Sequence, residues 1–253
     1  MKHNVIILTS GLSGSSVLTG LICRAGFWTG DRTHKKPQYD TFENSALIEL
    51  NLKLFEDAGY TGNYLMEFSQ EVIDNIRSLQ GIIKADPYRQ FVDKCNEHRP
   101  WIWKDPRLWL TIRFWQNLLD FNDCKFILLS RDPLQSWISQ TLRRQITTYR
   151  YSRSYERLIL QSALDFVTTN RLSFMNLRYE DLICRPSETI RELNDFLGTR
   201  LTVDNLRSVY NKPLYKSPRS SVIKHFKAAA IYARNYSERL DLTSANQARV
   251  TPK

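Results

Sequence analysis

The sequence has few cysteines and histidines, and it lacks the clusters of either residue that metal sites and redox centres need. Its four cysteines are widely separated, and no two of them form a CxxC pair. This spacing argues against a zinc ribbon or a redox dithiol, so we expect reduced thiols and no bound metal. The four histidines also stand singly, which disfavours a mechanism that relies on a histidine base.

Long hydrophobic runs are missing as well. No run reaches the length of a membrane span, and no leader precedes the first expected strand. We therefore expect a cytoplasmic protein without a membrane partner. Internal repeats and low-complexity linkers are also missing, so residues 1–253 are interpreted as a single domain with a flexible tail from about residue 241.

Acidic residues are in short supply relative to basic ones. The chain has 36 Lys and Arg against 26 Asp and Glu, a net charge of +10. Such a balance implies an anionic ligand or partner, which could be a nucleotide, a nucleic acid or a membrane surface. The hydrophobic fraction of 42% and the charged fraction of 25% are ordinary for a folded globular protein, which argues against extensive disorder.

The first turn of the chain is the main candidate for an anion site. Residues 5–8 are a run of four apolar residues that predicts a buried strand, and a helical pattern follows from about Val17. The Gly- and Ser-rich turn at residues 10–16 can place several backbone N–H groups at a helix N-terminus, where phosphate binds well. Ser15 and Ser16 add hydroxyl donors. The turn alone fits an ordinary strand-to-helix connection equally well.

This turn lacks the lysine of a Walker A loop. No Lys lies between Gly11 and Arg24, whereas that motif needs Gly-Lys-Ser or Gly-Lys-Thr. A nucleoside-triphosphate hydrolase or a nucleotide kinase is therefore disfavoured, and another phosphate-bearing ligand is required.

Apolar runs that alternate with helical patterns predict an α/β fold. Further strands are expected near residues 101–103, 125–130 and 174–179. Helices are expected from residue 41 or 44 to about 59, at 71–83, at 87–97 and at 108–119. Three more are expected: one that begins at residue 133, a long one that ends at about 169, and one at 186–197. A basic loop is expected at 212–227. This alternation predicts three layers, with a central, mainly parallel sheet flanked by helices.

The ends of the predicted strands carry the remaining candidate residues. In parallel sheets the ligand lies at the carboxyl ends of the strands. We therefore expect residues 10–16, Lys104, Arg131 and Tyr179 to converge on one cleft.

Three segments combine into a recognisable set. They are the turn Gly11-Leu12-Ser13-Gly14-Ser15-Ser16, the segment Arg131-Asp132-Pro133 with Ser139 eight residues after Arg131, and residues 178–182 followed by a helix that ends before Gly198. This set resembles the P-loop-like sulfotransferases, which move a sulfuryl group from 3′-phosphoadenosine 5′-phosphosulfate (PAPS) to a hydroxyl or an amine and release PAP. The likeness covers residues 5 to about 201.

The resemblance implies a set of residues that bind PAPS. Those expected to hold its 5′-phosphosulfate are Leu12, Ser13, Gly14, Ser15 and Ser16. Arg131 and Ser139 are expected to hold the 3′-phosphate, since an arginine at a strand end can form two parallel hydrogen bonds to phosphate. The alternative for Arg131 is a salt bridge to Asp132. Tyr179 packs against the adenine or in the core, and Arg219 closes over the 3′-phosphate or belongs to a solvated loop.

Two further segments resemble catalytic elements of the family. Residues 103–107, with the sequence WKDPR, imply that Lys104 and Asp105 face the transferring group, and residues 39–44 imply a glutamate near the acceptor. We expect Glu43 to act as the general base, with Asp105 as the next choice. The simpler readings are a surface turn with an internal ion pair and a helix N-cap formed by Asp40 or Thr41.

One position departs from the family pattern. Many members carry Lys or Arg where this chain has Leu12, so the cation that neutralises the bridging oxygen of PAPS must come from elsewhere. Lys104 is the first candidate, followed by Arg107 and the basic residues of 212–224. The gap leaves open an alternative, a catalytically impaired protein that binds PAP or another nucleotide.

The acceptor is expected to be a small molecule, as for the bacterial sulfotransferases that tailor natural products. A saxitoxin-type guanidinium alkaloid is one possibility, with acidic contacts from Asp40, Glu43 and Glu67. The rival function is binding of single-stranded nucleic acid by basic residues interleaved with tyrosines, namely Arg143, Arg144, Arg150, Arg153, Tyr149, Tyr151 and Tyr155. No recognised nucleic-acid module is present, which disfavours this rival.

Overall fold

A four-stranded parallel sheet forms the centre of the protein. The computed structural model describes residues 2–37, 39–79, 81–209 and 221–241. Strands β1 (Asn4–Thr9), β4 (Ile102–Lys104), β5 (Cys124–Ser130) and β6 (Phe174–Arg178) lie in the order β4-β1-β5-β6. Each neighbouring pair is parallel, with Ile7 opposite both Lys104 and Ile127. The predicted parallel sheet is confirmed.

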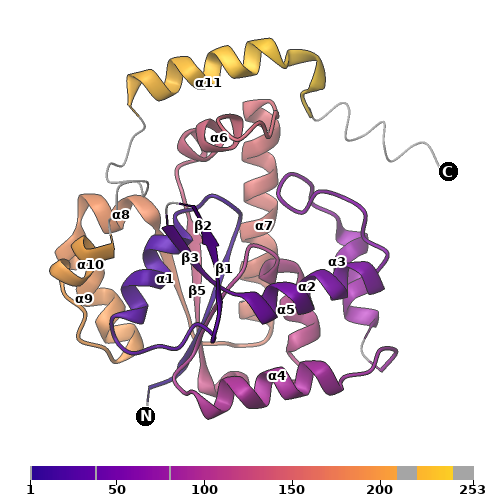
Figure 1. The fold of residues 1–253 in the computed structure, drawn as a ribbon, viewed down its shortest axis with the longest axis vertical. Coiled ribbons are helices and arrows are strands. Elements are labelled where there is room, and N and C mark those ends of the chain that lie inside the picture. The colour runs from indigo at the N-terminus through magenta and orange to yellow at the C-terminus, as the bar shows by residue number, and fades with distance from the viewer. Residues whose placement is uncertain (1, 38, 80, 210–220, 242–253) are drawn as a thin grey trace.

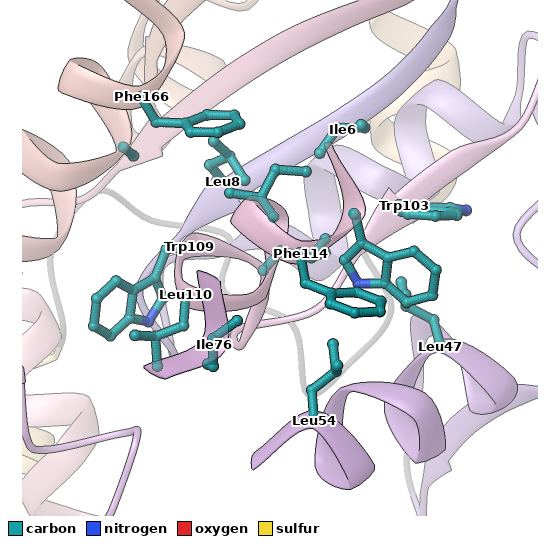
Figure 2. Packing of buried hydrophobic residues seen from close by; sticks show 14 of the residues in the cluster. Ile6, Leu8, Leu47, Leu54, Ile76, Trp103, Trp109, Leu110, Phe114 and Phe166 are labelled. Carbon is teal, nitrogen blue, oxygen red and sulfur yellow. The ribbon is translucent and has the colours of Figure 1, made fainter. Parts of the chain in front are cut away.

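The strands are buried on both faces because their side chains alternate between two apolar clusters. Ile6 and Leu8 point into a large aromatic cluster that includes Trp103 (Figure 2). Val5 and Ile7 belong to a second cluster on the opposite face of the sheet. This burial on both sides explains why the strands read as continuous apolar runs.

Helices cover both faces of the sheet (Figure 1). Those that contribute to the aromatic cluster are α2 (Ser45–Asp57), α3 (Gln70–Ser78), α4 (Asp86–Glu97), α5 (Leu108–Trp115) and α7 (Tyr149–Thr169). Those that contribute to the second cluster are α1 (Ser15–Cys23), α8 (Tyr179–Cys184), α9 (Pro186–Leu197) and α10 (Val203–Val209). The predicted three-layer α/β architecture is therefore confirmed.

The remaining elements of the described chain are a hairpin, two helices and two short 3-10 turns. A hairpin is formed by β2 (Thr33–Lys36) and β3 (Tyr39–Asn44). Helix α6 (Pro133–Thr141) follows β5, and α11 (Val222–Arg234) packs against α6. Short 3-10 turns occupy Phe121–Asp123 and Tyr236–Glu238. None of the helices in the described ranges is both long and apolar enough to cross a membrane.

Two sequence predictions about local structure were wrong. Residues 39–44 form a strand, so of the two predicted helix starts Thr41 is wrong and Asn44 is confirmed; the N-cap is Asn44, whose side chain accepts a hydrogen bond from Ala46 N at 3.0 Å, rather than Asp40 or Thr41. The basic segment predicted as a loop is helical from Val222, because a run of alanines there favours helix. Residues 210–220 lie outside the described ranges.

A buried carboxyl group lies where α7 meets α6. Glu156 is 5% exposed. Burial raises the pKa of Glu156 from its ordinary 4.5 to about 8, against the opposing effects of the Ser136 hydroxyl and the Arg131 guanidinium. The native state therefore keeps a proton on this carboxyl at pH values where the unfolded chain has released it.

We predict that Glu156 makes the protein less stable as the pH rises. Between about pH 4.5 and pH 8 the free energy of unfolding should fall by up to about 1.4 kcal/mol per pH unit through this group. The Glu156→Gln variant cannot titrate and should lose this part of the slope. Urea denaturation of both proteins at about pH 5.5 and about pH 7.5 measures the difference, since every other titrating group is shared. Equal slopes would contradict the prediction.

Candidate active site

One cavity collects the residues that follow the carboxyl ends of the strands. Its volume is about 490 Å³, within the range of roughly 300–1,000 Å³ of small-molecule sites. The candidate residues that line it include Glu43, Ser15, Ser16, Lys104, Arg131 and Ser139. The predicted convergence of separate chain segments on one cleft is therefore what the structure shows.

The loop between β1 and α1 has an unusual backbone. Leu12 and Gly14 both have positive φ values, of 65° and 86°. A Cβ atom on Gly14 would lie 2.2 Å from the ring of Tyr179, so only glycine fits there. Tyr179 is fully buried and supports the loop from below, within the second apolar cluster. This support places the loop at the N-terminus of α1.

The loop fits an anionic group. The helix begins at Ser15, and the first N–H groups of a helix have no partners within it. Ser13 is fully buried, and its hydroxyl has no hydrogen-bond partner within the described part of the chain. Ser15 and Ser16 line the cavity itself. A buried hydroxyl without a partner and a helix N-terminus are both suited to phosphate or sulfate oxygens.

Arg131 connects the end of β5 to the loop. Its Nη1 atom donates to the Leu12 carbonyl at 2.7 Å and to Ser139 Oγ at 3.3 Å, and its guanidinium lies 5.4 Å from the centre of the Tyr179 ring. Asp132, the alternative partner for Arg131, caps helix α6 by accepting a hydrogen bond from Gln135 N at 3.0 Å. Arg131 and Ser139 therefore form a pair beside the loop of residues 12–16, which we call the anion loop.

Lys104 lies between the hairpin and the loop. Its Nζ atom is 2.5 Å from Glu43 Oε1 and 3.4 Å from Ser16 Oγ. The side chains of Lys104 and Glu43 are 2% and 15% exposed, so this is a largely buried ion pair. The hairpin presents Glu43 because Phe42 adopts a positive φ of 57°, and Asp40 stabilises that turn by accepting from Phe42 N at 2.7 Å.

Asp105 belongs to a different network. Its side chain is fully buried and binds Arg107 Nη1 at 2.9 Å and Asn51 Nδ2 at 3.1 Å. Burial raises the pKa of Asp105, against the lowering effect of Arg107. Arg107 lines the cavity and also donates to Tyr64 Oη at 2.7 Å. Asp105 therefore holds Arg107 in place, whereas Glu43 is the carboxylate that reaches the cavity.

Sequence reasoning missed Asn51 and Tyr64. Asn51 lies on the face of α2 that also buries Leu47 and Leu54, and a polar residue at that helical spacing was the available signal. Tyr64 comes from the connection between α2 and α3, where no periodic pattern marks it. Its carbonyl accepts a hydrogen bond from Tyr155 Oη at 2.6 Å.

Some predicted contacts are not brought to the cavity. Asp40 is engaged within the hairpin, where it accepts hydrogen bonds from Phe42 N and from Thr33 Oγ1. Glu67 accepts from Asn63 N at 3.4 Å, and neither carboxylate is among the cavity residues described. Arg219 lies outside the described residues, and Lys224 of α11 does line the cavity. Among the described residues, no group of three or more His, Cys, Asp or Glu could hold a metal ion.

The chain thus combines a parallel α/β sheet with a Gly- and Ser-rich loop after its first strand, an arginine after a neighbouring strand and a buried Lys–Glu pair. The model of the sulfotransferase family matches residues 13–203. The chain therefore belongs to the sulfotransferase family and is a sulfotransferase enzyme.

Solved structures of sulfotransferase domains share the fold. The domain from the olefin synthase of Synechococcus PCC 7002 is 18% identical, with a TM-score of 0.53, and the match covers 92% of this chain and 96% of that one. The domain from the curacin biosynthetic pathway is 17% identical, with a TM-score of 0.51, and the match covers 88% and 82%. No curated protein matches the sequence significantly.

We predict that the close approach of Gly14 to Tyr179 is essential to the loop. Gly14→Ala introduces both backbone strain and the clash, and should cost more than about 2 kcal/mol of stability. Gly26→Ala is a matched control, because Gly26 has the same φ of 86° and nothing within 4 Å of the added Cβ. It should cost only about 1 kcal/mol. Urea denaturation compares the two, and equal losses would show that the contact with Tyr179 is unimportant.

Proposed function

We propose that this protein transfers a sulfuryl group from PAPS to a hydroxyl or nitrogen of a small-molecule acceptor. The observation that carries the proposal is that a single cavity is lined both by the anion loop and by the Arg131–Ser139 pair. PAPS has two anionic ends, a 5′-phosphosulfate and a 3′-phosphate. Two anion sites within one cavity suit a ligand of this kind.

Each anionic end of PAPS is assigned its own binding residues. The loop from Leu12 to Ser16 would hold the 5′-phosphosulfate, with Ser13 contributing its buried hydroxyl. Arg131 and Ser139 would hold the 3′-phosphate, since Arg131 Nη1 and Ser139 Oγ already lie 3.3 Å apart. PAPS supplies the sulfuryl group and leaves as PAP. Tyr179 is among the residues that line the cavity, but because its ring is fully buried beneath Gly14 we assign it to the support of the loop rather than to the adenine.

Lys104 is the cation that we propose in place of the loop lysine. Transfer of a sulfuryl group builds negative charge on the bridging oxygen, and a fixed cation in a dry site stabilises such charge strongly. Lys104 Nζ is 3.4 Å from Ser16 Oγ, so it lies against the loop that would hold the phosphosulfate. The absence of a lysine at position 12 does not leave the site without a positive charge.

Glu43 is the proposed general base. It lines the cavity at the end of β3, whereas Asp105 is engaged with Arg107 and Asn51. A base must lie within hydrogen-bond reach of the proton that it accepts, and a carboxylate at the cavity wall can do so. Lys104 holds Glu43 Oε1 at 2.5 Å and therefore fixes the direction in which the carboxylate faces.

The acceptor is proposed at the level of a small molecule. A guanidinium alkaloid would find fewer acidic contacts than the sequence suggested, because Asp40 and Glu67 form hydrogen bonds elsewhere and, of these three carboxylates, only Glu43 is among the described residues that line the cavity. The two structural neighbours named above come from a biosynthetic pathway and from a synthase, which supports an acceptor of the natural-product type.

The rival function in nucleic-acid binding loses support. Of the three interleaved tyrosines, Tyr151 and Tyr155 are 8% and 4% exposed and belong to the aromatic cluster. Base stacking needs an accessible ring face, which these two side chains cannot offer. Tyr149 and the arginines of this region remain exposed.

We predict that Arg131→Ala weakens PAP binding by about 100-fold, since it removes charge-assisted hydrogen bonds to the 3′-phosphate. Titration calorimetry with PAP measures this loss. Arg157→Ala is the control, because Arg157 is an exposed arginine on α7. It should bind PAP as the parent does. Unchanged affinity in the Arg131→Ala variant would exclude the proposed 3′-phosphate site.

We predict that Lys104→Met lowers kcat by about 100-fold or more while PAP binding changes little, because the lost charge stabilises mainly the transition state. The double variant Lys104→Met with Leu12→Lys should recover part of kcat, because position 12 lines the same cavity. Leucine already adopts the positive φ of 65° there, so lysine adds no new backbone strain. Assays of sulfuryl transfer measure the rates of both variants, and titration calorimetry measures their PAP binding. An unaltered kcat in Lys104→Met would exclude the proposed role, and a parent that binds PAP without turnover would favour the impaired binding protein.

A further inference from the structure

Helix α11 exposes its apolar side chains to solvent. Val222, Ile223 and Phe226 are 70%, 78% and 73% exposed. Because an α-helix turns by about 100° per residue, these three side chains lie within one sector of roughly 100°. The same sector contains the exposed Ala230 and Ala233.

The opposite side of α11 faces the protein. Ala228 is fully buried, and the ring of Tyr232 packs edge-on against Trp137 of α6 at 5.5 Å. Figure 1 shows α11 lying across the end of the molecule beside α6. An ordinary surface helix exposes mainly polar side chains, whereas α11 also exposes the three large apolar side chains named above.

The apolar face is bordered by positive charge. Residues 222–237 contain no Asp or Glu, and on α11 Lys227 and Arg234 lie at one edge of the apolar sector. Residues 133–155 also lack acidic residues, and Arg143, Arg144 and Arg150 are exposed there. The two segments are in contact, since α11 packs against α6 and the ring of Tyr232 lies 5.5 Å from that of Trp137. We call α11 together with these three arginines the basic apolar surface.

We infer that the basic apolar surface binds the face of an anionic lipid bilayer. A helix with apolar residues on one side and cations beside them lies in the membrane interface, where the apolar side chains enter the headgroup region and the cations meet anionic lipids. Phe226 is the largest of the side chains that would insert. This inference revises the sequence-based expectation that no membrane takes part, although no membrane span is involved.

Two other occupants fit this surface less well. Single-stranded nucleic acid could stack on the exposed ring of Phe226, but the adjacent Val222 and Ile223 are aliphatic and offer a base no ring face. A second copy of the chain would bring the same basic residues face to face, and like charges across an interface oppose association. An anionic bilayer complements both the apolar side chains and the charge.

The surface also adjoins the active site. Lys224 of α11 lines the cavity, so the helix that would dock is also part of the cavity wall. If the proposed function holds, docking would bring the enzyme close to acceptors that partition into the membrane. The docking itself does not depend on sulfuryl transfer.

Vesicle co-sedimentation of the full chain tests the inference. The parent should bind vesicles of phosphatidylcholine with about 30% phosphatidylglycerol, bind pure phosphatidylcholine weakly, and release as salt is added. Phe226→Glu should weaken binding about tenfold or more, and Lys227→Ala and Arg234→Ala about fivefold each. Ile82→Glu is the matched control, because Ile82 is also 73% exposed but lies away from the surface, and this variant should bind as the parent does.

Several outcomes would overturn the inference. They are absence of binding by the parent, equal binding by Phe226→Glu, binding of an oligonucleotide but not of vesicles, and a dimer in analytical ultracentrifugation that Phe226→Glu dissociates without any binding to vesicles. Far-UV circular dichroism shows that each variant is folded. Because the vesicle assay uses no nucleotide, its failure leaves the proposed transfer intact, and loss of PAP binding would not affect the docking.

Discussion

The arrangement of the active site depends on one buried cation. Lys104 is 2% exposed at the end of β4. Burying an ion in this way costs on the order of several kcal/mol of folding free energy, which a close partner of opposite charge must offset. Glu43 is that partner, so the hairpin that carries it must stay against the sheet. The ion pair therefore does two things: it orients the proposed base, and it attaches an antiparallel hairpin to a parallel core that shares no strand with it.

Much of this organisation could be predicted because it depends on strands that are buried on both faces. Such strands read as continuous apolar runs, and a parallel sheet brings the residues that follow them to a single edge. Ser15, Lys104 and Arg131 were placed together on that argument alone, and the structure places all three at one cavity. Position was predictable here because the topology leaves few alternatives.

What could not be predicted depends on contacts between segments that are distant in the sequence. Residues 39–44 form a strand because β2 pairs with them and because Phe42 adopts a positive φ. Neither feature can be read from the local sequence pattern. The role of Asn51 likewise follows from Asp105, which is 54 residues away. The first residues of α11 were predicted as a loop because the segment is basic, and the helix buries only Ala228, so it lacks the apolar stripe that marks a packed helix.

Leu12 shows that the loss of a lysine or arginine from the loop does not by itself remove the positive charge from the site. Strands β1 and β4 are neighbours, with Ile7 opposite Lys104, so the end of β4 lies next to the loop that follows β1. A positive charge from either segment reaches the same part of the cavity, which both Leu12 and Lys104 line. Lys104 is held by the sheet and by Glu43, whereas a lysine at position 12 would sit on a strained turn. Electrostatic catalysis needs a charge at a position in space, and the fold offers more than one place in the sequence from which to supply it.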